Sequence, residues 1–282
     1  MDGFNLRETD EADGHRWAVV DCACSLNAED PVITAIVDLV RTSYGESEIV
    51  KRAERWNEIT PDPAVEETFD LDALRNAVRL GMPDPNEEKN KPAQLTNYRS
   101  ESAEMVARSA LAVAYGLVFP PAPQVGKANP NQPILGFDGW ALEKLDGEKY
   151  AFVLTQVKGT DQAKCPPDEA KTLVEECKRV AHQTGKVARA LSMIVLLLEP
   201  ESEMGKALIG MLELIGQGTL PPLLVAPAIV RGTTSADMGD LVPLRNAAST
   251  FMPAKSRCVT VSLGTALGPF GEYVMEQARA SV

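Results

Sequence analysis

The sequence predicts an α/β fold with a mixed central sheet flanked by helices. Amphipathic helical segments alternate with short strand-like runs along most of the chain. One pair of runs, on either side of an Asp-Gly dipeptide, has the pattern of a β-hairpin. The chain has 282 residues, 44% of them hydrophobic, which suffices to bury one large core or a core with a smaller attached lobe.

The composition of the chain limits the location and the kinds of catalytic site that we expect. No run approaches eighteen apolar residues, and the acidic N-terminus lacks the basic and apolar regions of a signal peptide, so we expect a cytoplasmic protein without membrane contact. The five cysteines form no C-x-x-C pair, and two histidines are too few for a histidine-rich metal site. The sequence also lacks the P-loop motif and the G-x-S-x-G elbow. Carboxylates and lysine are therefore the expected catalytic groups.

The net charge of −12 is unevenly distributed. Residues 1–90 contain 21 acidic and 9 basic residues, whereas residues 91–282 contain 19 of each. Nucleic-acid enzymes usually carry a basic surface, and the balanced second part keeps this class open. We predict an acidic N-terminal α/β lobe with a Pro-rich connector over residues 1–92, and a second domain over residues 93–282.

The N-terminal lobe is predicted to begin with a strand over Trp17–Ser25. A helix should follow over Asp30–Tyr44, because Asp30 suits an N-cap, proline follows it, and Gly45 can end the helix. A second short helix should reach Trp56. The connector contains one helical segment near residues 71–80.

The second domain should begin with a helix over Tyr98–Tyr115 that ends at Gly116, followed by a Pro-rich loop and the hairpin. The elements expected after the hairpin are a helix over 167–190, a buried strand in the apolar run SMIVLLLE, a helix over 203–215, strands over 223–230 and 257–263, and a helix from Phe270.

The hairpin carries the residues of greatest chemical interest. Its first strand contains GFDGW at 136–140, and its second contains TQVKG at 155–159. Asp138 offers carboxylate oxygens and Gln156 an amide oxygen to a divalent cation, and Lys158 could polarise water or stabilise a pentavalent phosphate. These three residues outline a metal-dependent phosphodiesterase site.

The turn decides whether the three polar side chains share a face, because a slip of one residue moves every side chain of a strand to the other side. A two-residue loop, Asp146-Gly147, would put Asp138 opposite Thr155 and separate it from the other two. A three-residue loop over 145–147, with Gly147 left-handed, would put Asp138 opposite Leu154 and unite all three. We predict the second register, or a bulge of the same phase, because it also gathers an apolar patch of Trp140, Leu142 and Phe152.

These residues resemble the motif of the PD-(D/E)XK nuclease superfamily, in which a helix glutamate, a strand aspartate and an (E/Q)-x-K strand build a magnesium site. The triplet at 156–158 is similar to the Q-x-K variant of Mrr-type restriction endonucleases. The resemblance covers roughly residues 97–200 and implies a restriction-endonuclease-like core. It implies Glu104 or Glu101 as the helix acid and Lys158 as the catalytic cation. The implied ligands of Mg²⁺ or Mn²⁺ are Asp138, Gln156, the Val157 carbonyl and Glu104.

A narrower resemblance is to the nuclease subunit of Hachiman-type anti-phage defence systems, which implies a helicase or another defence protein as a partner. The resemblances together imply an endonuclease that hydrolyses DNA phosphodiester bonds in restriction or antiviral defence. The sequence leaves open a homo-oligomer.

An alternative function is that of a catalytically inactive, nuclease-like subunit that binds a protein or nucleic acid. In that case Asp138 only caps a strand and Lys158 is a solvated strand end. The acidic lobe would then dock a basic partner, or it would shield the site from DNA. The neutral Gln156, where a carboxylate is usual, keeps this alternative open.

Overall fold

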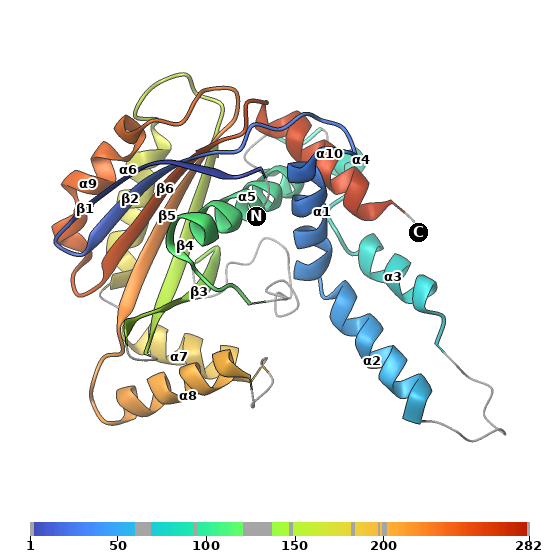
Figure 1. Ribbon diagram of the computed structural model, residues 1–282, viewed down its shortest axis with the longest axis horizontal. Coiled ribbons are helices and arrows are strands. Elements are labelled where there is room, and N and C mark those ends of the chain that lie inside the picture. The colour runs from blue at the N-terminus through green and yellow to red at the C-terminus, as the bar shows by residue number, and fades with distance from the viewer. Residues whose placement is uncertain are drawn as a thin grey trace.

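The computed structural model describes residues 3–59, 69–88, 90–92, 95–120, 137–146, 149–181, 184–196, 198 and 202–280. They form an α/β fold with a six-stranded mixed sheet flanked by helices, which confirms the predicted class (Figure 1). The predicted Pro-rich loop before the hairpin lies largely outside these residues. No helix among them is both long and apolar enough to cross a membrane.

The strands lie in the order β1-β2-β6-β5-β4-β3. Neighbours among β2, β6, β5 and β4 pair in parallel, and the edge strands β1 and β3 pair antiparallel with β2 and β4. The strand bounds are β1 (Asn5–Ala12), β2 (His15–Asp21), β3 (Gly139–Lys144), β4 (Tyr150–Thr160), β5 (Leu223–Arg231) and β6 (Lys255–Ser262).

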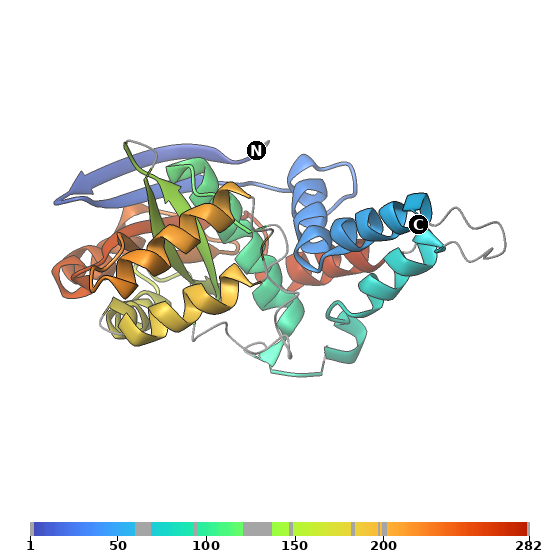
Figure 2. The ribbon, with the colours of Figure 1, turned by 90° about the horizontal axis from the view of Figure 1, so that it is seen from below.

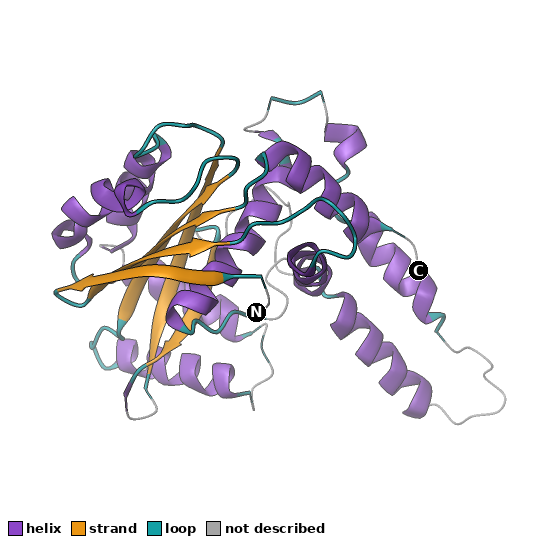
Figure 3. Ribbon diagram, turned by 45° about the horizontal axis from the view of Figure 1, so that its top comes forward, coloured by secondary structure: helices purple, strands orange, loops and turns teal. Residues whose placement is uncertain are grey.

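Helices cover both faces of this sheet (Figure 3). One face, here called the α5 face, packs against α5, with α1 and α10 behind it; the other, the α6 face, packs against α6 to α9. The helix bounds are α1 (Pro31–Ser43), α2 (Glu46–Ile59), α3 (Leu71–Leu80), α4 (Pro85–Glu88), α5 (Asn97–Tyr115), α6 (Glu169–Ala181), α7 (Thr184–Val195), α8 (Glu203–Gly216), α9 (Val242–Asn246) and α10 (Leu267–Arg279). Helices α2 and α3 pack on each other and reach away from the sheet (Figure 2).

The N-terminal strands belong to the central sheet. The predicted strand is β2, shifted to His15–Asp21, and it pairs in parallel with β6. Strand β1 was not predicted because its sequence, NLRETDEA, is polar and its side chains are mostly exposed. It joins β2 through Asp13 and Gly14, whose φ angles of 53° and 77° suit a tight hairpin turn. The predicted boundary after residue 92 thus falls between strands of one sheet.

The predicted helices of the N-terminal part are confirmed. The Asp30 side chain accepts hydrogen bonds from the main-chain N–H groups of Val32 and Ile33, as an N-cap does. Gly45 follows α1 with a left-handed φ of 81°. Helix α5 begins within one residue of the prediction and ends at Gly116, which also has a left-handed φ.

The region predicted as one helix over 167–190 is helical but divided into two helices, and the predicted strand after it is wrong. Two helices, α6 and α7, occupy this region, and the start of SMIVLLLE is the last turn of α7. The buried side chains of α7 are Val187, Ala190, Leu191 and Ile194, whose spacing of three and four is that of a helix. Met193 and Leu196 are exposed, which a buried strand would not allow. The remaining elements lie close to their predicted ranges: α8, β5, β6 and α10.

Candidate active site at the edge of the β3–β4 hairpin

The β3–β4 register fixes which side chains share a face. The pairs run from Lys144 opposite Tyr150 to Gly139 opposite Thr155. The predicted pair of Asp138 with Leu154 is wrong, because the loop is two residues longer than predicted and Trp140 lies opposite Leu154. An even shift keeps the phase, so the predicted faces hold for the paired residues of the hairpin. Gly147, predicted to be left-handed, lies outside the described residues.

The apolar patch predicted from this phase is confirmed. Trp140, Leu142 and Phe152 are buried together on the α6 face, against α7 and α8. The Trp140 and Phe152 rings stack with their centroids 5.9 Å apart. This patch anchors the end of the hairpin that carries Asp138.

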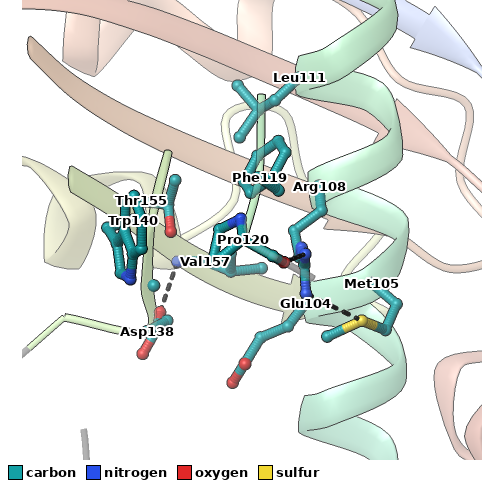
Figure 4. A pocket seen from close by; sticks show the side chains of 11 residues that line it. Glu104, Met105, Arg108, Leu111, Phe119, Pro120, Asp138, Trp140, Thr155 and Val157 are labelled. Carbon is teal, nitrogen blue, oxygen red and sulfur yellow. Dashed lines mark hydrogen bonds between the residues drawn. The ribbon is translucent and has the colours of Figure 1, made fainter. Parts of the chain in front are cut away.

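Asp138 lies directly before β3, where the described β3–β4 ladder ends. Its Oδ2 accepts a hydrogen bond of 2.6 Å from the Val157 N–H of β4 (Figure 4). A hydrogen bond to a charged group contributes about 1.5–3 kcal/mol. The carboxylate is therefore held at the sheet edge, beside the main chain that links Gln156 to Lys158.

Glu104 approaches Asp138 from the α5 face. Both residues line a small, open pocket between α5 and the start of β3. Figure 4 shows the Glu104 and Asp138 side chains projecting into this region. Arg108, one turn after Glu104, donates to the Pro120 carbonyl at 2.8 Å, and burial lowers its pKa to about 10 while Glu104 opposes this shift.

Glu101, the other candidate for the helix acid, points elsewhere. It is buried and accepts a hydrogen bond of 2.7 Å from the hydroxyl of Tyr44, the residue that follows α1. Burial and the Glu101 carboxylate together raise the pKa of Tyr44 far above its ordinary value. Of the two helix acids, Glu104 is the one that lines the pocket.

Gln156 and Lys158 lie on the α6 face, because side chains of a strand alternate and Leu154 packs there. The Lys158 Nζ atom forms an ion pair of 3.0 Å with Glu176 Oε1 of α6. Gln156 is 7% exposed, and its Oε1 atom has no hydrogen-bond partner among the described residues. The predicted site is thus divided: Glu104 lies on the α5 face, Gln156 and Lys158 lie on the α6 face, and Asp138 stands at the edge between them.

Glu176 was not predicted as a site residue. Its neighbour Cys177 is buried, which raises the pKa of the thiol; Cys258, Glu176 and Asp138 raise it further, and Lys158 opposes them. The charges of Asp138, Lys158 and Glu176 therefore act on one buried side chain. The Q-x-K spacing carries no signal for Glu176, because its position depends on how α6 packs across the sheet.

The oxygen atoms at this edge fit a hard divalent cation with a mixed ligand set. The described residues contain no group of three or more His, Cys, Asp and Glu side chains that could hold a metal, so a cation would also need neutral oxygens. Gln156 Oε1 is such an oxygen, buried and without a described partner. The Val157 carbonyl is another, because the N–H and C=O of one strand residue project to the same side, here toward Asp138. Carboxylate, amide and carbonyl oxygens suit Mg²⁺ or Mn²⁺.

Comparisons with known proteins do not identify a family for this chain. No protein-family model matches the sequence, and a search of curated proteins finds no significant match.

Proposed function

We propose that the chain is a metal-dependent endonuclease of the PD-(D/E)XK type that hydrolyses DNA phosphodiester bonds. The observation that carries the proposal is the position of Asp138, whose carboxylate is held on the Val157 N–H between Gln156 and Lys158. The element order α5, β3, β4, α6, β5 supports it, because a helix acid, a hairpin and a second helix then meet at one sheet edge. We extend the proposal to restriction or anti-phage defence, with a helicase or similar partner, on the strength of the Q-x-K motif.

The residues have distinct roles in this proposal. Asp138, the Gln156 amide oxygen and the Val157 carbonyl would hold Mg²⁺ or Mn²⁺, with Glu104 contributing from α5. When bound, the cation supplies a Lewis acid that polarises a phosphoryl oxygen. The Lys158 ammonium, at the same edge, would stabilise the negative charge that develops on the phosphate.

A second function is favoured by one specific observation. The Lys158 ammonium is engaged by Glu176 at 3.0 Å, as it would be in a protein that uses this lysine to tie β4 to α6. A nuclease-like subunit without chemistry would bind a partner through the same surface. The two functions make opposite predictions for cleavage.

The test is a cleavage assay on single-stranded, duplex and nicked DNA, with Mg²⁺, with Mn²⁺ and with a chelator. We expect metal-dependent cleavage that Asp138→Ala and Lys158→Ala each reduce about 100-fold or more, since each removes a charge that acts on the transition state. Lys144→Ala is the matched control, because Lys144 belongs to the same hairpin, is 58% exposed and lies 3.8 Å from Glu203. Cleavage that survives both site substitutions would reject the nuclease, and no cleavage of any substrate by the unaltered protein would favour the binding subunit.

A further inference from the structure

Two buried acceptor oxygens flank Lys158 on the α6 face. The first is Gln156 Oε1, two residues earlier on β4. The second is Glu176 Oε2; the other oxygen of this carboxylate, Oε1, forms the ion pair with Lys158. Neither has a hydrogen-bond partner within the described ranges. A buried acceptor without a partner costs about 1–3 kcal/mol, and more when it is charged, so two of them beside one lysine are not explained by stability.

Packing fixes Glu176 in this position. Its neighbours Leu173, Val174 and Cys177 are buried against β5 and β6 in the core of the α6 face. This holds α6 on the sheet and directs Glu176 to Lys158. Asp138 accepts a hydrogen bond from the Val157 N–H, and Glu176 pairs with Lys158, the next residue of β4. Two carboxylates, from α6 and from the start of β3, therefore contact consecutive residues of β4.

We propose that Glu176 is a ligand of the divalent cation at this site, and that it supplies the second carboxylate that Gln156 does not. This inference rests on the proposed function. Glu176 takes the place in the shell that the proposed function gives to Glu104, because Glu176 lies on the α6 face with Gln156, whereas Glu104 lies on the α5 face. The resulting donor set is Asp138, Glu176, the Gln156 amide oxygen and the Val157 carbonyl, with water completing the shell, as Mg²⁺ and Mn²⁺ prefer. Two carboxylates neutralise a divalent charge, which one carboxylate and an amide do not.

The ion pair between Lys158 and Glu176 stabilises the site when no cation is bound. Two carboxylates that converge repel each other when no cation is present. The ammonium group, 3.0 Å from Glu176 Oε1, offsets this repulsion and leaves Oε2 for another partner. Glu176 would thereby also keep Lys158 beside the phosphate.

The experiment measures Mn²⁺ binding to the metal-free full chain by calorimetry, a readout independent of cleavage. We expect Glu176→Gln to weaken Mn²⁺ binding about tenfold or more. Adding Gln156→Glu to that variant returns a second carboxylate to the same face, and we expect binding to recover to within about threefold of the unaltered protein, on the same ligand count. Glu175→Gln is the matched control, because Glu175 is on the same helix, exposed and paired with Lys178, and should leave binding unchanged.

Lys158→Met distinguishes two roles of Glu176: a ligand of the cation, or only the ion-pair partner of Lys158. If Glu176 only neutralised or positioned Lys158, Glu176→Gln would no longer weaken Mn²⁺ binding in a Lys158→Met background, and the inference would be overturned. If Glu176 is a ligand, Glu176→Gln weakens Mn²⁺ binding about as much in that background as in the unaltered protein. Should Glu176→Gln fail to fold, Glu176→Asp, one methylene shorter, is read in the same way: weaker binding supports the inference and unchanged binding overturns it.

Failure of this inference is distinguishable from failure of the proposed function. Tight Mn²⁺ binding that Glu176→Gln leaves unchanged, but Asp138→Asn abolishes, overturns only the role of Glu176. An unaltered protein that binds no Mn²⁺ overturns the metal site itself, and the role of Glu176 with it.

Discussion

The Asp138 carboxylate takes a main-chain N–H of β4 at the point where the described β3–β4 ladder ends. The faces of the paired hairpin residues could be predicted from sequence, because strand alternation and the parity of the turn decide them. The place of Asp138 between the two faces could not, because Asp138 lies before β3 and outside the ladder. The exact pairing could not, since loops that differ by two residues give the same phase. Two further features could not be predicted: Glu104 and Lys158 lie on opposite faces of the sheet, and Lys158 contacts Glu176. Both depend on which face each helix covers.

The burial of His15 makes the stability of the fold depend on pH. His15 is buried, and its Nδ1 accepts a hydrogen bond of 3.1 Å from the Ser256 N–H. Burial, and then the charges of Lys255 and Arg257, lower the pKa of His15 below its ordinary value. The unfolded chain therefore binds a proton at His15, below about pH 6.5, that the folded protein does not. Stability gained from neutral His15 is present above that pH and is lost as the pH falls below it.

We expect the free energy of unfolding in urea to fall between pH 7.5 and pH 5.5, and to fall less in a His15→Gln variant. Comparing the two proteins at each pH cancels the contribution of other titrating groups. Parallel pH profiles would show that His15 does not carry this dependence.

Among the helices and strands, the helix caps could be predicted from sequence, but whether an apolar run forms a helix or a strand could not. Asp30 and the glycines at 45 and 116 mark helix ends through local hydrogen bonds and backbone angles, which a sequence displays directly. The run SMIVLLLE suits a buried strand and a buried helix equally, and its packing against the hairpin decides for the helix. Strand β1 was missed because an exposed edge strand has little apolar alternation, although its Asp-Gly turn was readable.

The pairing of α2 with α3 rests on a buried ion pair. Arg79 donates to both carboxylate oxygens of Glu46, at 2.7 and 2.9 Å, and both side chains are almost fully buried. Glu46→Gln would leave a buried charge without its partner, so we expect a loss of about 3 kcal/mol in the free energy of unfolding. The double replacement Glu46→Leu with Arg79→Met should cost clearly less, because no charge stays buried.

Urea denaturation measures both effects. The control is Glu48→Gln, which removes an exposed pair with Lys51 on the same helix and should change stability by no more than about 0.5 kcal/mol. A loss in Glu46→Gln as small as that in Glu48→Gln would contradict the structural role of the pair.

At the scale of the whole molecule, the charge asymmetry suggested two domains, but charge reports on the surface and not on strand order. Strand β2 pairs along its length with β6, a connection of more than two hundred residues that local sequence patterns do not reveal. The acidic N-terminal part therefore contributes both an edge of the sheet and the helix α1, which packs with α5 and α10.

This connectivity predicts that residues 93–282 do not fold alone. Removing residues 1–92 would expose the β6 edge and the apolar surfaces of α5 and α10, which favours aggregation. We expect the full chain to unfold in one cooperative transition by calorimetry and the fragment to show none. A fragment that unfolds cooperatively would instead support a domain boundary near residue 92.

The role of Asp138 as a ligand of the catalytic cation is tested by the rate of DNA cleavage as a function of Mg²⁺ concentration, for the unaltered protein and for Asp138→Asn. Asparagine keeps an oxygen that can accept the Val157 N–H but removes the charge, so the fold is retained while the cation loses a principal ligand. We expect a rate that rises and saturates with Mg²⁺ in the unaltered protein, and a loss of about 100-fold or more in the variant. Equal rates in the two proteins, or cleavage that does not respond to Mg²⁺, would show that Asp138 does not hold a catalytic cation.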